Sequence, residues 1–266
     1  MSQRPVFVLS GHGINCESET AYAYQLAGLP TEIVPLSALF RGDRRLAECS
    51  LLHLPGGFSF GDHLGAGLVL ADRFRHGKLP SGASLFGELT RFVDDGGHVV
   101  GICNGFQVLV RTGLLPDLGG AHQPEAALLP NAGASFEDRW VHVRMGGIFA
   151  ELGDLELPVR HGEGRLVFQD AAHAARVAAS AQIVMSYVGA DGAAEPAYPA
   201  NPNGSWLAAA GLADRTGRVL GCMPHPEAFL WPEHHPAWAR HARPQRPDGL
   251  RFFQLLASRV RSAQSA

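Results

Sequence analysis

The sequence lacks a long hydrophobic run and a marked excess of either charge. Its first apolar run, after residues MSQR, is only five residues long, and no later segment approaches the roughly 20 apolar residues of a membrane span. A net charge of −3 at pH 7 offers no basic surface for nucleic acid or for an anionic membrane. We therefore expect a cytoplasmic protein that binds neither nucleic acid nor a membrane.

Cysteine is scarce and has no regular spacing. The 266 residues contain four cysteines, none with Cys-x-x-Cys spacing: Cys16, Cys49, Cys103 and Cys222. This pattern argues against a disulfide framework and against a zinc ribbon. We expect reduced thiols, one of which can be reactive.

The order of predicted elements favours one large α/β domain over residues 1–266 rather than two smaller ones. In the first half, helices that begin at Glu17 and Ser84 alternate with strands, which are predicted at 5–10, 31–35, 51–55 and 98–102. This alternation is typical of a parallel sheet with helices on both faces and a site at the carboxyl ends of its strands. The second half is richer in strands, which are predicted at 139–145, 157–160, 183–187, 207–210 and 219–223. A closing amphipathic helix is predicted from Leu250 onward.

The stretch His98–Gln107 is the most informative in the chain. A short apolar strand runs into Gly-Ile-Cys103-Asn-Gly and then into a predicted helix. The two glycines relieve crowding at such a corner, so Cys103 can be held at the helix N-terminus. Helix N–H groups stabilise a thiolate there, and the N–H of Asn104 points to where an oxyanion would form. The alternative is a small buried cysteine beside glycines that packing requires, and the motif alone does not decide between them.

A glycine pair after another predicted strand is the second candidate element. In Pro-Gly-Gly57-Phe-Ser-Phe-Gly-Asp62, the backbone N–H groups, including that of Gly57, can point toward an anion or a developing oxyanion. A simple tight turn is the alternative, because such glycine pairs are common in turns.

The third candidate element is Met-Pro-His225-Pro-Glu227, which follows the last predicted strand. Each proline biases the preceding residue toward extended backbone, so His225 and Glu227 are expected on one side of an extended chain. The carboxylate can then accept the imidazole N–H, and Cys103, His225 and Glu227 would form a triad of nucleophile, base and orienting acid. A proline-rich surface loop is the alternative for this pentapeptide alone. The three elements together favour the triad.

Five motifs between Val6 and about Phe253 resemble a known family. They are residues 56–62, 101–107, 159–165, 198–205 and 223–227. They resemble the class I (triad) glutamine amidotransferases and, more narrowly, the glutaminase subunits of phosphoribosylformylglycinamidine synthase. The His-Gly-Glu-Gly-Arg and Asn-Pro-Asn-Gly-Ser elements separate this family from other triad amidotransferases. The resemblance implies a flavodoxin-like fold with a central, mostly parallel sheet.

The resemblance also implies a reaction. Cys103 would attack the side-chain amide of glutamine while the N–H groups of Gly57 and Asn104 hold the oxyanion. His225, oriented by Glu227, would protonate the leaving ammonia and activate the water that hydrolyses the thioester.

The glutamine site and the partners are implied in the same way. The glutamine end would be bound by Gln107, His161, Gly162 and Glu163. No cofactor is expected on this chain, because ATP and magnesium would belong to the synthetase subunit that receives the ammonia. A small bridging subunit is a further candidate partner.

Two segments depart from the family pattern. Where the family carries Asn-x-Ser-x-Arg-Phe, this chain has Asn-Ala-Gly-Ala-Ser-Phe at 131–136, which puts in doubt how this segment meets substrate or partner. The segment His-Pro-Ala-Trp at 235–238 resembles the long single-chain synthases more than the separate subunits. The number of partner chains therefore stays open.

Other functions account for the sequence less completely. One alternative is a stand-alone cysteine hydrolase on the same fold, but such an enzyme does not require its base on a distant His-Pro-Glu element. A second alternative is a non-catalytic interaction protein, which leaves the complete set of catalytic roles in three separate elements unexplained. A metal site at His234, His235 and His241 is disfavoured because suitably spaced carboxylate or cysteine ligands are missing nearby.

Overall fold

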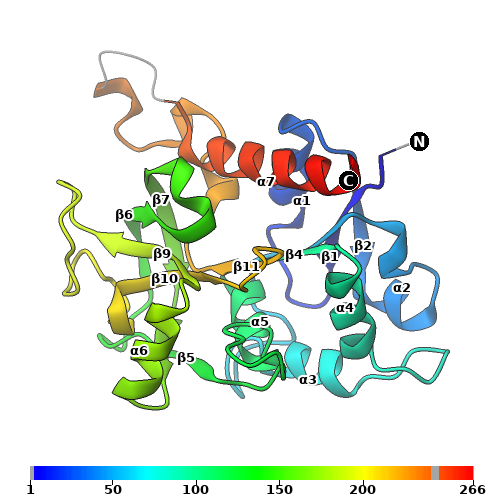
Figure 1. Ribbon diagram of the computed structural model, residues 1–266. Coiled ribbons are helices and arrows are strands. Elements are labelled where there is room, and N and C mark those ends of the chain that lie inside the picture. Colours follow the sequence, from blue (N-terminus) through cyan, green and yellow to red (C-terminus); the bar gives the residue numbers. More distant parts are fainter. Residues whose placement is uncertain (1–2, 241–245, 266) are drawn as a thin grey trace.

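A nine-stranded mixed sheet forms the centre of the computed structural model, which describes residues 3–240 and 246–265 (Figure 1). The strand order is β2-β1-β3-β4-β11-β10-β9-β6-β7. Neighbours from β2 to β11 are parallel and those from β11 to β7 antiparallel. The predicted fold class is therefore confirmed. The strands are β1 Val6–Ser10, β2 Thr31–Pro35, β3 Leu51–Leu54, β4 His98–Ile102, β6 Glu137–Met145, β7 Asp154–His161, β9 Ile183–Val188, β10 Ala209–Ala213 and β11 Val219–Cys222.

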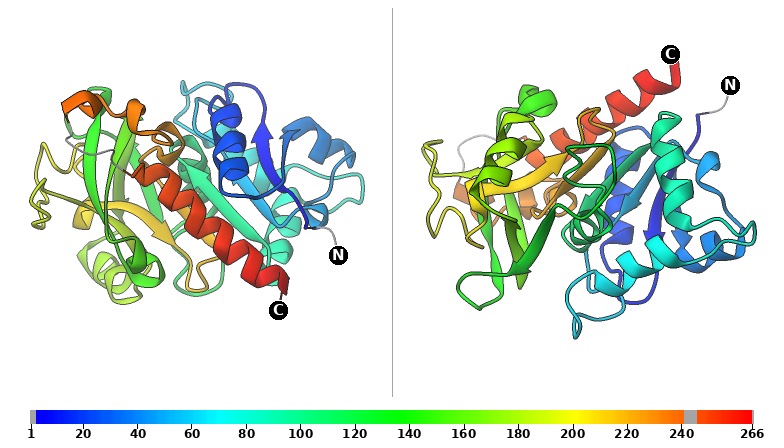
Figure 2. Two further views of the ribbon diagram at one scale, coloured as in Figure 1. Left: turned by 90° about the horizontal axis from the view of Figure 1, so that it is seen from above. Right: turned by 60° about the horizontal axis from the view of Figure 1, so that its bottom comes forward.

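Helices cover both faces of this sheet. Figures 1 and 2 show α1 and α7 together on one face and α3, α4 and α5 on the other. Because both faces are covered, β1, β3 and β4 are buried along almost their whole length, which explains their mostly apolar sequences. No helix in the described part of the chain is long and apolar enough to cross a membrane. The helices are α1 Glu17–Leu26, α2 Leu36–Arg41, α3 Leu68–His76, α4 Leu85–Asp94, α5 Asn104–Thr112, α6 Ala171–Ala179 and α7 Asp248–Ser265.

Local sequence explains the start of α4 and the buried face of α7. The Ser84 hydroxyl accepts a hydrogen bond from the Gly87 N–H at 3.0 Å and caps α4, as expected for a serine before a helix. In α7, the apolar positions Phe253, Ala257 and Val260 are buried, which confirms the predicted amphipathic helix.

A separate two-stranded sheet supports the site. It pairs β5 (Ala126–Pro130) with β8 (Glu163–Phe168) in antiparallel orientation. Neither strand was predicted from the residues, because both are short and depend on each other for pairing.

Other elements also differ from the sequence predictions. The predicted strand at 207–210 begins only at Ala209, because Trp206–Ala208 forms a 3₁₀ turn with a positive φ at Leu207. Helix α3 was not predicted, since its glycine-rich approach carries no helix signal; α3 is held by packing against α4 and α5.

Candidate active site

Cys103 lies on a sharp corner between β4 and α5. Its backbone adopts φ 52° and ψ −104°, a strained conformation for a residue with a side chain. The flanking glycines are required by close packing: a Cβ on Gly105 would lie 1.9 Å from the Leu54 carbonyl oxygen, and one on Gly101 would lie 2.6 Å from the Gly105 carbonyl. The elbow predicted from the sequence is thus present, and the chain around it cannot relax easily.

The thiol opens into a cavity of about 180 Å³. The Cys103 side chain is close to the Arg160 carbonyl oxygen, with the sulfur donating at 3.6 Å. A larger hollow of about 460 Å³ near His12 and Arg73 has no thiol or carboxylate in its lining. Seven of the predicted site residues line the smaller cavity: Gly57, Cys103, Gln107, His161, Gly162, Glu163 and His225.

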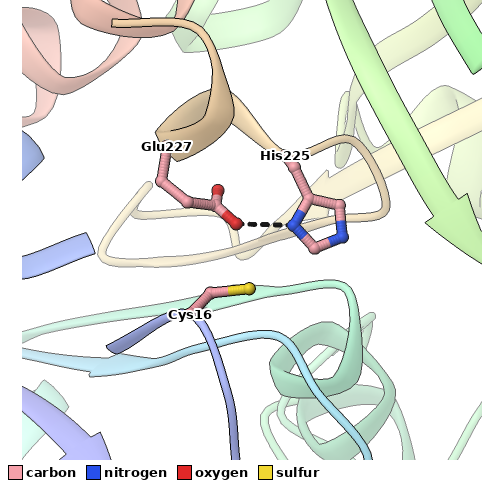
Figure 3. A group of neighbouring side chains, drawn as sticks. All are labelled: Cys16, His225 and Glu227. Carbon is pink, nitrogen blue, oxygen red and sulfur yellow. Dashed lines mark hydrogen bonds and ion pairs between the residues drawn. The ribbon is translucent and has the colours of Figure 1, made fainter. Parts of the chain in front are cut away.

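His225 and Glu227 form a buried hydrogen-bonded pair. The distance from His225 Nδ1 to Glu227 Oε1 is 2.5 Å (Figure 3). The predicted proximity is correct, but the predicted extended backbone is wrong, because Pro226–Ala228 forms a 3₁₀ turn that brings the carboxylate back to the imidazole. The second proline therefore begins a turn rather than prolonging the strand.

The charges of this pair stabilise each other. Burial alone would lower the pKa of His225, but the charge of Glu227 and the neighbouring Cys103 raise it well above its usual value. Burial would likewise raise the pKa of Glu227, and the charge of His225 holds it below its usual value instead. The pair can therefore hold a proton on the imidazole beside the thiol.

Two backbone N–H groups near the thiol have no acceptor in the described part of the chain. Asn15 N–H donates to Gly56 O and Phe58 N–H to Gly13 O, so the Gly57 N–H between them points away from that segment. Gly57 has φ 135°, and a Cβ there would lie 2.5 Å from Gly13 O. Asn104 begins α5, and within the described residues neither its N–H nor that of Gly57 has a hydrogen-bond acceptor. Both groups can therefore donate to an oxyanion.

The side chains of Asn104 and Gln107 are committed to the protein. Asn104 Oδ1 accepts from the Ser59 N–H at 3.2 Å, and Asn104 Nδ2 donates to Gln107 Oε1 at 2.9 Å. Gln107 Nε2 in turn donates to the Glu163 carbonyl oxygen at 2.6 Å. This chain of hydrogen bonds joins the glycine-pair loop, the elbow and the start of β8.

The segment 161–164 is fixed by Asn131. Its Nδ2 donates to the carbonyl oxygens of His161 and Ser135, and its Oδ1 accepts from the Gly164 N–H and from His161 Nδ1. Burial and the charge of His225 lower the pKa of His161 to about 4, so its ring is neutral. Ser205, from the Asn-Pro-Asn-Gly-Ser element, supports the same region by donating to Gly164 O.

Cys16 is a site residue that the sequence prediction missed. The sulfur of Cys16 and side-chain atoms of His225 and Glu227 lie within 4.8 Å of one another, and Figure 3 shows the thiol facing the pair. Burial raises the pKa of the Cys16 thiol. The signal was available, because Cys16 lies in the loop after β1 and loops at the carboxyl ends of parallel strands converge on one edge.

Five other cavity residues were missed, most of them within quoted motifs: Asn15, Phe58, Asp62, Phe136 and Arg160. Asp62 ends the glycine-pair motif, and Arg160 precedes His161. Phe136 belongs to the segment that departs from the family pattern, and more than half of its surface is exposed. This departing segment thus borders the cavity.

The histidines near the C-terminus are occupied locally. His234 Nδ1 accepts from the Leu230 N–H, and His235 lies against Trp140 and within 3.2 Å of Glu156. His241 lies outside the described residues. Within the described part, these contacts give His234 and His235 packing roles.

Comparison with known proteins places the chain in a family. A family model described as a CobB/CobQ-like glutamine amidotransferase domain matches residues 3–258. The chain belongs to this glutamine amidotransferase family. Among relatives of the amidotransferase, the phosphoribosylformylglycinamidine synthase subunit PurQ of Dehalococcoides mccartyi is 39% identical over 258 residues, covering 95% of this chain and 96% of the relative. The subunit PurQ of Picrophilus torridus is 33% identical over 260 residues, covering 96% and 98%.

A solved structure shows the same fold. The structure of PurLQS from Thermotoga maritima matches with a TM-score of 0.68 and 26% identity, covering 96% of this amidotransferase and 99% of that chain. Its high coverage of both chains means that the likeness extends over the whole domain rather than over the sheet alone.

Proposed function

We propose that this chain is the glutaminase subunit of phosphoribosylformylglycinamidine synthase. It hydrolyses glutamine to glutamate and ammonia and passes the ammonia to an ATP-dependent synthetase, which converts formylglycinamide ribonucleotide to formylglycinamidine ribonucleotide. The names of its relatives support this proposal. The observation that carries it is one cavity holding the elbow thiol of Cys103, the imidazole of His225 and the Gly57 backbone.

The reaction follows from the placement of these groups. His225 takes the proton of the Cys103 thiol as the sulfur attacks the side-chain amide carbon of glutamine. The N–H groups of Gly57 and Asn104 stabilise the oxyanion. His225 gives its proton to the leaving nitrogen, so ammonia departs and a glutamyl thioester remains. His225 then accepts a proton from water, whose oxygen attacks the thioester and releases glutamate, while Glu227 holds the imidazole in place.

The partners follow from the fate of the ammonia. Ammonia that escapes into water is protonated and is no longer a nucleophile, so the glutaminase has to dock on the synthetase. The name PurLQS, borne by the similar Thermotoga maritima structure, groups PurL, PurQ and PurS, which supports a synthetase and a small bridging protein as partners of this chain. The reaction above uses only side chains and backbone of this chain; ATP and magnesium are assigned to the synthetase.

We also propose one glutaminase domain in the cytoplasm. The single nine-stranded sheet that includes strands from both halves of the chain supports one domain. Four free cysteines, including the proposed nucleophile, support a reducing compartment.

The test separates ammonia production from amidation. In the reconstituted synthase, Cys103→Ala should abolish glutamine-dependent amidation and leave amidation with ammonium salt at raised pH intact. Loss of both activities in an assembled complex, or retention of both, would contradict the role of Cys103. A wild-type chain that hydrolyses glutamine but binds no synthetase would favour a stand-alone hydrolase.

A further inference from the structure

The thiol of Cys16 lies beside the catalytic pair but takes no part in the proposed reaction. The Cys16 sulfur, a ring nitrogen of His225 and a carboxylate oxygen of Glu227 all lie within 4.8 Å of one another (Figure 3). Cys16 directly precedes α1, yet its side chain makes no capping hydrogen bond to that helix. Neither the helix nor the reaction therefore accounts for a thiol at this place.

The catalytic pair has unused bonding capacity. His225 Nε2 and Glu227 Oε2 are buried and have no hydrogen-bond partner within the described residues, and the two residues are only 4% and 3% exposed. Buried polar atoms without a partner are rare, and a bound ion is one explanation for them. In the proposed reaction His225 Nε2 exchanges protons, whereas Glu227 Oε2 has no role. A metal ion beside the pair would satisfy such an oxygen.

Gly56 keeps space open between the thiol and the imidazole. A Cβ at this position would lie 2.8 Å from His225 Cε1 and 3.5 Å from Cys16 Sγ. Both groups thus converge on a point that a larger residue at position 56 would fill. Cys16 and His225 also line the cavity of about 180 Å³, which gives a small ion a path to them.

The three side chains are of the types that bind zinc. Zn²⁺ binds thiolate sulfur, imidazole nitrogen and carboxylate oxygen at about 2.0–2.3 Å, usually in a tetrahedron. Ligand atoms in such a tetrahedron lie roughly 3–4 Å apart, so atoms within 4.8 Å of one another need only small side-chain shifts. Mg²⁺ instead prefers oxygen ligands in an octahedron. The ligand set therefore favours zinc over the magnesium assigned to the synthetase.

We infer that Cys16, His225 and Glu227 form an inhibitory zinc site. Zn²⁺ takes the place of the proton between His225 and Glu227 and of the proton on the Cys16 thiol, and both protons leave to water. One thiolate and one carboxylate then balance the charge of the metal, and water from the cavity supplies a fourth ligand. An imidazole bound to zinc no longer moves protons, so glutamine hydrolysis stops. This inhibition rests on the proposed function, whereas zinc binding does not.

Another group of metal-binding side chains has to be distinguished from this site. His142 Nε2 and His235 Nε2 lie 4.0 Å and 3.2 Å from Glu156 Oε1, but this group contains no thiol. Co²⁺ adopts the same tetrahedral coordination as zinc and gives a sulfur-to-cobalt charge-transfer band in the near ultraviolet when a thiolate binds it. The band therefore reports the site at Cys16 and not the one at Glu156.

Cobalt and zinc titrations of the full chain without an affinity tag test the binding. The Cys103→Ala chain should show the band, because the nucleophile is not a ligand. Adding Cys16→Ser should abolish the band and weaken zinc by more than the roughly 10- to 100-fold cost of losing an outer-sphere partner. Adding Glu227→Gln should keep the band and weaken zinc. Cys49→Ser is the matched control and should change neither, because Cys49 is a fully buried thiol outside the cavity lining.

The assembled synthase tests the consequence for catalysis. Free Zn²⁺ would be held constant by a chelating buffer while amidation is measured with glutamine and with ammonium salt. We expect zinc to abolish glutamine-dependent amidation and to leave ammonia-dependent amidation intact. A zinc-selective chelator should restore the lost activity.

Contrary results separate this inference from the proposed function. A missing band in Cys103→Ala, or an unchanged band after Cys16→Ser, would overturn the zinc site whatever the glutaminase activity. Glutamine hydrolysis that persists in the zinc-bound wild-type chain, or equal loss of both amidations, would overturn the inhibitory role. A zinc-free wild-type complex that does not hydrolyse glutamine would overturn the proposed function and leave the binding result standing.

Discussion

Replacing Asn131 by alanine should loosen the segment that carries His161 and Glu163. The Asn131 amide is 3% exposed and makes four hydrogen bonds of 2.8 to 3.1 Å. At a net contribution of about 1 kcal/mol each, and with two buried donors left without acceptors, we expect Asn131→Ala to lower the free energy of unfolding by about 3–4 kcal/mol. Because the freed segment lines the cavity, the KM for glutamine should also rise.

Urea unfolding and steady-state glutaminase assays would measure both effects. Asn201→Ala is the control: Asn201 is equally buried and makes three hydrogen bonds, to Pro196 and Ser205, with none to residues 161–164. It should lower stability with a smaller effect on KM. A change in unfolding free energy below about 0.5 kcal/mol for Asn131→Ala, or an equal KM effect in both variants, would refute this reasoning.

Three further predictions concern thiols, the triad and pH. Iodoacetamide should alkylate Cys103 faster than Cys16, Cys49 and Cys222. Burial raises the pKa of these other three thiols, that of Cys49 to about 12. Faster labelling of any of the three would contradict the assignment of Cys103 as the nucleophile. Glu227→Gln should impair glutaminase activity far less than His225→Ala in steady-state assays, since the carboxylate orients and the imidazole moves protons; equal losses would give Glu227 a larger role. Burial lowers the pKa of His53 to about 3, so acid protonates the unfolded chain near pH 6.5 but not the folded one. Unfolding free energy should therefore fall by about 2 kcal/mol from this group between pH 7 and pH 5, and a His53→Gln variant that keeps the full pH dependence would disprove this origin.

Much of the site was predictable because local sequence imposes it. The elbow at Cys103 requires glycines where β4, α5 and β3 approach closely, and such contacts leave a visible sequence pattern. The glycine at 57 is likewise required by its positive φ and by the approach of Gly13. In these places a short motif and the three-dimensional constraint coincide.

The unpredicted parts depend on contacts between distant segments. The His225–Glu227 contact was expected from an extended chain but arises from a 3₁₀ turn, because a proline also favours the first position of a helical turn. Cys16 and Arg160 enter the site through the fold, from the loop after β1 and from β7. Gln107 was assigned to substrate, and only the structure reveals that Asn104 and Glu163 already occupy its amide.

The departing segment 131–136 illustrates the same division. The family pattern flagged the loss of an arginine and a serine there, while the structure retains Asn131 as the anchor of residues 161–164 and places Phe136 at the cavity. Residues 131–136 lead into β6, and β6 pairs with β7, which carries Arg160. Phe136 and Arg160 therefore line the same cavity. Such a relation between adjacent strands is set by register and is invisible in a linear motif.

Trapping the covalent intermediate tests the central claim most directly. The wild-type synthase would be mixed with glutamine, quenched in acid during turnover, digested and analysed by mass spectrometry. A glutamyl group should be found on the peptide containing Cys103 and be absent from the Cys16 peptide and from the Cys103→Ala complex. A glutamyl group on Cys16, or glutamine hydrolysis that persists in Cys103→Ala, would contradict the account.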